Sequence, residues 1–246
     1  MSSSRAWRYV TFDATGTLLR PAEPPGTTYL RFWETVSGQT FSSSRRTALA
    51  AALTSHFPVE FSLQSRRCPN FGADGVSTSA YPWWHELTLN VMKHEVPGLT
   101  HAEQTERFTQ DLYAHFGRPE AWTVFDDVRP TLETLKEENV PMGVISNFDE
   151  RLEPLLVDLE LRSFFDVVTT SFNQPQMKPH AYIFFCTFKK LQGQEDVDAR
   201  DHVSKDYQAA KALGAHAKLV WRNKGKTPSE VEEKDVIETL QELATD

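Results

Sequence analysis

The stretch of sequence that decides the fold is RYVTFDATGTLL, residues 8–19. Its first five residues are mainly β-branched or aromatic and predict a short strand, which we expect to be the central strand of a sheet. This strand ends at Asp13 and meets the turn formed by residues 15–17. A carboxylate between a buried strand and a glycine turn lies at the carboxyl edge of an open sheet, where ligands bind. Asp13 is therefore a candidate site residue, although an Asx-turn or a helix cap explains it equally well when it is taken alone.

Downstream of about Trp122, short apolar runs alternate with amphipathic segments. This alternation is typical of a parallel sheet with helices on both faces. Gly214 should end the last helix of the series. We expect strands at residues 142–145, 165–169 and 217–221. We expect two helices that begin near Pro130 and near Lys178, and two more at residues 152–159 and 206–213.

Residues 21–117 differ from the rest of the chain because they are rich in Ser, Thr and aromatic side chains. Apolar residues recur at helical spacing inside this segment, and Thr100 and Glu103 have the spacing of a capping box. We therefore expect a mostly helical segment inserted between the first strand and the remaining sheet. The sheet domain would then be discontinuous and would consist of residues 1–20 and 118–246.

The composition limits the class of protein. Of the 246 residues, 39% are hydrophobic and 24% are charged, which suits one large or two small folded domains. We find no apolar run long enough to span a membrane and no secretory signal, so we expect a soluble, cytoplasmic protein with no membrane partner. The 26 Lys and Arg against 34 Asp and Glu give a net charge of −8, which argues against nucleic acid as a partner. Cys68 and Cys186 are too few for a disulfide framework or a zinc site.

Three further groups of polar residues follow expected strands or precede expected helices. Ser146 and Asn147 come directly after a strand, where a hydroxyl can donate a hydrogen bond to a phosphoryl oxygen. Lys178 precedes a proline, whose fixed turn would aim the ammonium group at the same sheet edge. Asp201 and Asp206 lie at a loop that leads into a helix. Each group also has a plain structural explanation, as a helix cap, a solvated lysine or a partner of the helix dipole.

Taken in order along the chain, these groups resemble the motifs of the haloacid dehalogenase superfamily of hydrolases and phosphatases. The nucleophile motif corresponds to FDATGTLL at residues 12–19. Within the superfamily, the sequence is most similar to the haloacid dehalogenase-like hydrolase domain-containing protein 3 group. The resemblance implies an α/β fold with a Rossmann-like parallel-sheet core and an inserted helical cap. The phrases that carry the narrower resemblance are LLR at residues 18–20, CPNFG at 68–72, WW at 83–84 and ISNFDERL at 145–152.

The resemblance also implies a reaction and the residues that perform it. Asp13 would attack a phosphoryl group of a small phosphorylated metabolite in line, and water would hydrolyse the resulting aspartyl-phosphate. Ser146, Asn147 and Lys178 would hold the phosphoryl group. Lys178 would in addition neutralise the phosphate and the attacking carboxylate.

The cofactor implied by the resemblance is Mg²⁺, held by Asp13, the backbone carbonyl of Thr15, and Asp201. Arg200 stands where the superfamily has a glycine, and the approach to it is acidic, which does not suit a buried strand. Either the strand expected there is short and exposed, or this segment differs in structure from its relatives. Arg200 could block a close approach of the backbone, or its guanidinium could partly substitute for magnesium. A shifted register that gives the metal role to Asp196 stays open.

Thr15 is the main departure from the phosphatases of the superfamily, which usually place a second Asp here to protonate the leaving alkoxide. A threonine hydroxyl is a poor acid or base, and losing such a group typically lowers a rate by about 10²–10⁴-fold. The string DATGT at residues 13–17 also resembles the phosphorylated motif of P-type ATPases, whose phosphoenzyme persists. Three hypotheses follow: a slow or specialised phosphatase, an inert pseudo-phosphatase that binds a metabolite or a protein, and a halide-releasing hydrolase supported by the superfamily's name alone.

Overall fold

The computed structural model describes residues 9–96, 99, 101–192, 206–214, 216–222 and 231–244. The chain folds into two compact units. The first unit, which we call the sheet unit, comprises Met1–Arg20, Val124–Phe148 and Leu159–Asp246. The second, the helical unit, comprises Pro21–Thr123 and Asp149–Asp158. The inserted segment expected from the sequence covers residues 21–117, so the helical unit contains six more residues after Gly117 and residues 149–158 as well.

The sheet unit is built on parallel strands in the order β1-β4-β5. These strands are β1 (Val10–Phe12), β4 (Met142–Ser146) and β5 (Val167–Thr170). Phe12 pairs with Val144 and Ser146 with Thr170, so the carboxyl ends of the strands lie along one edge. Every residue of β4 is buried, as is usual for a strand of a parallel sheet with covered faces. Among the described strands β4 is the middle one, a place that the sequence analysis expected for the first strand.

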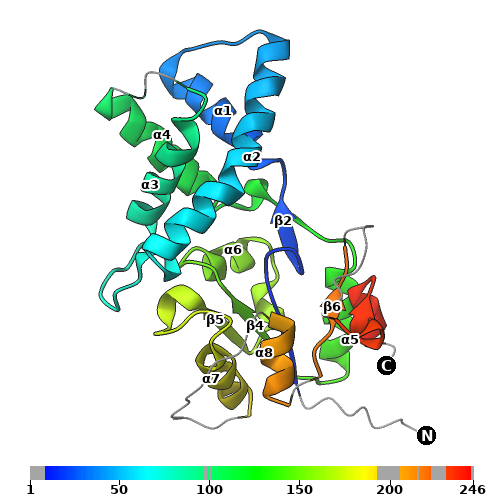
Figure 1. The fold of residues 1–246 in the computed structure, drawn as a ribbon. Helices are drawn as coiled ribbons and strands as arrows, with labels where there is room; N and C mark the ends of the chain where they lie inside the picture. Colours follow the sequence, from blue (N-terminus) through cyan, green and yellow to red (C-terminus); the bar gives the residue numbers. More distant parts are fainter. Residues whose placement is uncertain are drawn as a thin grey trace, which may run out of the picture. The chain divides into compact units, whose positions relative to one another are not determined.

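The helices of the sheet unit lie where the apolar spacing predicts them. α5 (Val128–Glu137) begins two residues before Pro130 and buries one apolar face. α7 (Ala181–Leu191) packs against β4 and β5 (Figure 1), and its Phe184 joins a core cluster with Ala209 of α8 (Asp206–Ala212). Gly214 follows α8 with a φ of 79°, a conformation that favours glycine, so this helix ends as predicted.

The remaining strands are short. The last expected strand is present as β6 (Leu219–Val220), which pairs in parallel with β7 (Val236–Ile237). A further pair is formed by β2 (Leu19–Pro21) and β3 (Trp122–Val124). Single turns of 3-10 helix cover Asn70–Gly72, Pro119–Ala121, Arg162–Phe164, Ser171–Asn173, Glu233–Asp235 and Leu240–Ala244.

The helical unit consists of α1 (Pro25–Ser37), α2 (Ser43–Arg67), α3 (Tyr81–Met92) and α4 (Ala102–His115), with α6 (Leu152–Asp158) added from later in the chain. Figure 1 shows these first four helices side by side, and α1 and α3 each contact both α2 and α4. Gly26 permits the contact of α1 with α2, because a Cβ atom there would lie 2.1 Å from the carbonyl oxygen of Ala50. No helix within the described ranges is long and apolar enough to cross a membrane.

The start of α4 differs from the predicted capping box. A box formed by Thr100 and Glu103 would start the helix at residue 101. Instead α4 begins at Ala102, and its N-cap residue His101 makes no side-chain cap hydrogen bond. Thr100 itself lies outside the described residues. The buried face of α4, which includes Phe108, is what holds this helix in place.

An ion pair explains why residues 149–158 belong to the helical unit. Asp149 is 1% exposed, and its carboxylate accepts a hydrogen bond of 2.6 Å from Arg151 Nη2 and one of 2.7 Å from Trp84 Nε1. Arg151 Nη1 donates to the carbonyl of Tyr113, and the guanidinium carbon lies 3.8 Å from the centroid of the Tyr113 ring. Burial would lower the pKa of Arg151, but the hydrogen bond and the charge of Asp149 raise it above its ordinary value. The start of this segment is therefore fastened to α3 and α4.

Replacement of Arg151 by Met should lower the free energy of unfolding by about 3–5 kcal/mol, because it leaves the buried carboxylate of Asp149 without its cation. Arg107 provides a matched control, since its 3.7 Å pair with Asp111 on α4 is exposed. Arg107→Met should change the free energy by about 1 kcal/mol or less. Urea unfolding followed by tryptophan fluorescence measures both values. Equal losses in the two variants would contradict a structural role for the buried pair.

Candidate active site

The structure brings Asp13, Ser146 and Lys178 together in the sheet unit. Asp13 follows β1, and Ser146 is the last residue of β4, so the parallel register places both at the carboxyl edge of the sheet. Ser146 Oγ donates a hydrogen bond of 3.1 Å to Asp13 Oδ1, and Lys178 Nζ donates one of 2.7 Å to the same oxygen. Asp13 and Ser146 are 133 positions apart in the sequence, and α6 and β5 lie between Ser146 and Lys178. All three were predicted from the sequence as site residues.

Lys178 is held in place from both ends of its side chain. Its Nζ donates a second hydrogen bond, of 2.8 Å, to the carbonyl of Ile145. Its backbone N–H donates to Asn147 Oδ1, and its backbone carbonyl accepts from Asn147 Nδ2, each at 2.8 Å. The Lys178 side chain is 6% exposed, whereas that of Asp13 is 27% exposed. The Asp13 carboxylate is therefore the more accessible member of this pair.

Asn147 lies beside these residues and bonds to the backbone of Lys178. Its side-chain oxygen and one side-chain N–H are bonded to the backbone of Lys178. These bonds fix the position from which the Lys178 ammonium reaches Asp13. Contact between Asn147 and a phosphoryl group stays a prediction, and support of Lys178 is what its side chain does in this structure.

The turn after Asp13 is fixed by its own backbone. The N–H groups of Thr17, Leu18 and Leu19 all approach the carbonyl of Ala14 at 2.8–3.3 Å, and Gly16 N–H donates to the carbonyl of Leu19. Gly16 has a φ of 86°, which a residue with a side chain would adopt only under strain.

Thr15 is exposed at this turn. It lines a cavity of about 610 Å³ in the sheet unit together with Asp13, Gly16, Thr17 and Lys178. Three of the predicted catalytic residues thus face one space.

The described part of the site supplies oxygen donors suited to a magnesium ion. Both side-chain hydrogen bonds to the Asp13 carboxylate go to Oδ1, so Oδ2 has no hydrogen-bond donor among the described residues. A carboxylate oxygen and a backbone carbonyl, such as that of Thr15, are the hard ligands that Mg²⁺ prefers. Asp201, Asp196 and Arg200 lie outside the described residues, and within those residues no three His, Cys, Asp or Glu side chains gather around a common point. The donor set fits Mg²⁺ as far as it is described.

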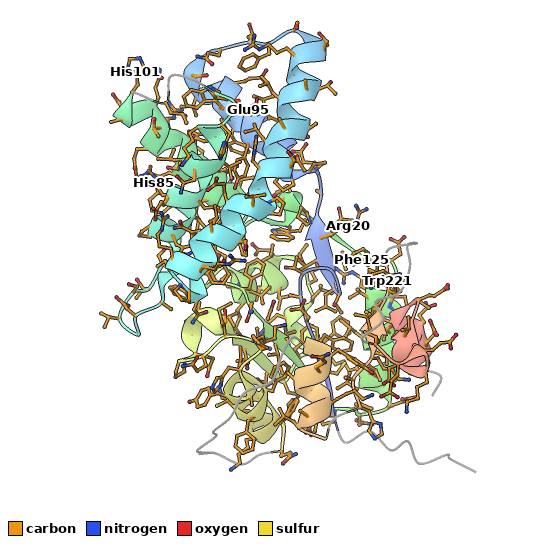
Figure 2. All side chains as sticks on the ribbon, viewed as in Figure 1. Arg20, His85, Glu95, His101, Phe125 and Trp221 are labelled. Carbon is orange, nitrogen blue, oxygen red and sulfur yellow. The ribbon has the colours of Figure 1, made fainter. Side chains whose placement is uncertain are left out.

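Two residues that the sequence analysis missed are Arg222, which bonds to the turn, and Asp127, which bonds to Arg222. Arg222 Nη2 donates a hydrogen bond of 2.7 Å to the carbonyl of Thr17, and Asp127 accepts two hydrogen bonds from the same guanidinium. Figure 2 labels Phe125 and Trp221, the neighbour of Arg222 in the chain, both of which belong to the sheet unit. A signal was available, because Arg222 directly follows the strand expected at residues 217–221, and ligand sites of parallel sheets gather at the carboxyl ends of strands.

Comparison with known proteins agrees with this geometry. A model of the haloacid dehalogenase-like hydrolase family matches residues 7–214. The haloacid dehalogenase-like hydrolase domain-containing protein 3 of Homo sapiens is 32% identical over 218 residues, which cover 87% of this chain and 81% of the relative.

Solved structures share the fold. A HAD phosphatase from Thermococcus onnurineus has a TM-score of 0.57 at 23% identity, with 97% of each chain covered. The HAD-hydrolase YfnB from Bacillus subtilis, solved bound to magnesium, has a TM-score of 0.64 at 13% identity, with 98% of each chain covered. At these identities the structural matches establish the arrangement of the elements, and the sequence matches establish descent. The family model covers most of the chain, and the human relative is 32% identical over most of both sequences, so the chain belongs to the haloacid dehalogenase-like hydrolase family.

Proposed function

We propose that the protein is a magnesium-dependent phosphatase that acts on a small phosphorylated metabolite through an aspartyl-phosphate on Asp13. The observation that carries this proposal is the pair of hydrogen bonds from Ser146 and Lys178 to Asp13 Oδ1. Ser146 and Lys178 both bond to Oδ1 and so hold the carboxylate in one orientation, while neither of them bonds to Oδ2. A fixed carboxylate beside a cation is what a nucleophile needs in order to approach an anionic phosphoryl group.

In the proposed reaction, a carboxylate oxygen of Asp13 forms a bond to phosphorus while the bond from phosphorus to the leaving oxygen breaks. The leaving alkoxide takes its proton from water. A second water then attacks the acyl phosphate, which releases inorganic phosphate and restores the carboxylate. Lys178 and Ser146 oppose the negative charge that gathers beside Asp13 throughout, because both donate hydrogen bonds toward it.

The ligands proposed for Mg²⁺ are Asp13, the backbone carbonyl of Thr15, and Asp201, with Asp196 as the alternative to Asp201. When bound, the ion would supply positive charge that neutralises the oxygens of the substrate phosphate. In this proposal the helical unit acts as the cap that selects the substrate.

Thr15 makes the proposed enzyme slow. Its hydroxyl can neither protonate a leaving alkoxide nor deprotonate water efficiently near neutral pH. The same substitution favours the second candidate function, a protein that binds a phosphorylated ligand without hydrolysing it. Both candidates use the same site, and measurement of turnover separates them.

Asp13→Asn should abolish the magnesium-dependent hydrolysis of p-nitrophenyl phosphate, because an amide cannot serve as the nucleophile. This aryl phosphate is the suitable substrate, since its leaving group needs little protonation. Asp126→Asn is the control: this aspartate is exposed in the same unit, and no role is assigned to it. The release of p-nitrophenolate with and without magnesium is the readout. Full activity in Asp13→Asn would rule out Asp13 as the nucleophile.

Thr15→Asp should raise the turnover of alkyl phosphates more than that of aryl phosphates, because general acid catalysis helps most when the leaving oxygen is basic. Thr15→Asn is the matched control, since it has nearly the same shape as Asp and no proton to transfer. Phosphate release from one substrate of each class gives the comparison. Equal stimulation of both classes would contradict the role assigned to position 15. Background rates for both substrates in every variant would favour the binding protein.

A further inference from the structure

Arg222 lies outside every motif of the site and nevertheless bonds to the turn that follows the proposed nucleophile. Its Nη2 donates to the carbonyl of Thr17 at 2.7 Å, across 205 positions of sequence. Thr17 belongs to the same turn as Thr15 and lies four residues after Asp13. The guanidinium therefore acts on the backbone that follows the attacking carboxylate.

A buried anion fixes the guanidinium in turn. Asp127 accepts hydrogen bonds of 3.1 Å from Arg222 Nη1 and 3.0 Å from Nη2, and both side chains are less than one-fifth exposed. Asp127 also accepts hydrogen bonds from Thr239 Oγ1 and from the N–H of Leu240. Burial alone would raise the pKa of Asp127, but these hydrogen bonds hold it below its ordinary value. The carboxylate is thus a fixed, ionised support for Arg222.

Phe125 fixes the plane of the guanidinium. The guanidinium carbon of Arg222 lies 3.8 Å from the centroid of the Phe125 ring, and the N–H of Phe125 donates to the carbonyl of Leu18. Figure 2 shows Phe125 and the neighbouring Trp221 in this part of the sheet unit. The segment that carries the stacking ring is therefore itself bonded to the turn. The carbonyl of Thr17 therefore accepts a hydrogen bond from the Arg222 side chain, and the adjacent carbonyl of Leu18 accepts one from the Phe125 backbone.

We propose that Arg222 is a positioning residue that holds the turn at residues 14–18 in the shape required for catalysis by Asp13. This inference rests on the proposed function. The bond from Arg222 adds to the backbone hydrogen bonds of the turn at its exposed part, where Gly16 has a positive φ and Thr15 is exposed. A hydrogen bond from a charged donor is stronger than one from a neutral donor, and an arginine stacked on an aromatic ring loses less freedom when it forms one.

The rival explanation is that Arg222 only neutralises Asp127. The two explanations predict different results for a variant that lacks both the Arg222 cation and the Asp127 anion. If neutralisation were the whole role, a double variant that removes the cation and the anion together would restore the wild-type properties. If Arg222 positions the turn, the double variant would still lack the donor to the Thr17 carbonyl.

The test compares wild type, Arg222→Met, the double variant Arg222→Met with Asp127→Asn, and the control Arg129→Met. Arg129 is matched because it also donates to a backbone carbonyl and pairs with a carboxylate in the sheet unit, but it bonds to Leu159 and Glu160 rather than to the turn. Hydrogen–deuterium exchange, followed by mass spectrometry, reports on the amides of residues 16–19 without any substrate. Steady-state kinetics with p-nitrophenyl phosphate and magnesium reports kcat and KM separately.

Arg222→Met should speed the exchange of these amides about tenfold or more, as expected for loss of a hydrogen bond from a charged donor. It should lower kcat by a similar factor and change KM much less, because the turn shapes the reacting centre. The double variant should show the same losses, and Arg129→Met should behave as wild type. Exchange that is unchanged in Arg222→Met, or a kcat that recovers in the double variant, would overturn the inference. Absence of turnover in wild type would count against the proposed function, while the exchange measurement would still decide whether Arg222 holds the turn.

Discussion

The hydrogen bond between the Lys178 ammonium and Asp13 Oδ1 is the interaction on which the candidate site depends. Lys178 is almost fully buried, and its ammonium is satisfied by Asp13 and the carbonyl of Ile145. A buried ammonium without acceptors is costly, so the carboxylate that is proposed to react is also one that the fold requires. The parallel pairing of β1 with β4 brings Asp13 near Ile145, whose carbonyl also accepts a hydrogen bond from Lys178. Asn147 fixes the backbone from which the lysine extends.

Sequence predicted the residues that lie at strand ends and failed for those that act through distant contacts. Asp13 and Ser146 could be found because parallel strands end at one edge, so polar residues that follow them must meet there. The partner of Asn147 could not be found, because spacing does not tell which backbone groups an amide will select. Arg222 follows an expected strand, but no local pattern shows that it bonds to a turn more than 200 positions earlier. The assignment of residues 149–158 to the helical unit has the same cause, since the buried pair that anchors them depends on helices far away in the sequence.

Family membership identifies the class of protein, whereas Thr15 bears on the rate of the proposed reaction. The match over residues 7–214 shows that the chain is a member of the haloacid dehalogenase-like hydrolase family. The fold agrees with this family, and Ser146 and Lys178 both lie within hydrogen-bonding distance of Asp13 at the sheet edge. Thr15 leaves the proposed nucleophile and its cation in place and removes a proton donor and acceptor. With an aryl phosphate, whose leaving group needs little protonation, the proposed site would form an acyl phosphate more readily than it would hydrolyse one. The proposed function therefore predicts a phosphoenzyme whose breakdown is slow.

Direct detection of that phosphoenzyme is the most decisive measurement. The protein would be mixed with p-nitrophenyl phosphate and magnesium, quenched with acid during turnover, digested, and mapped by mass spectrometry. The account predicts one phosphoryl group on the peptide that contains Asp13, absent without magnesium and absent in Asp13→Asn. Release of phosphate by wild type with no phosphorylated Asp13 peptide at any time point, or a phosphoryl group on another residue, would contradict it.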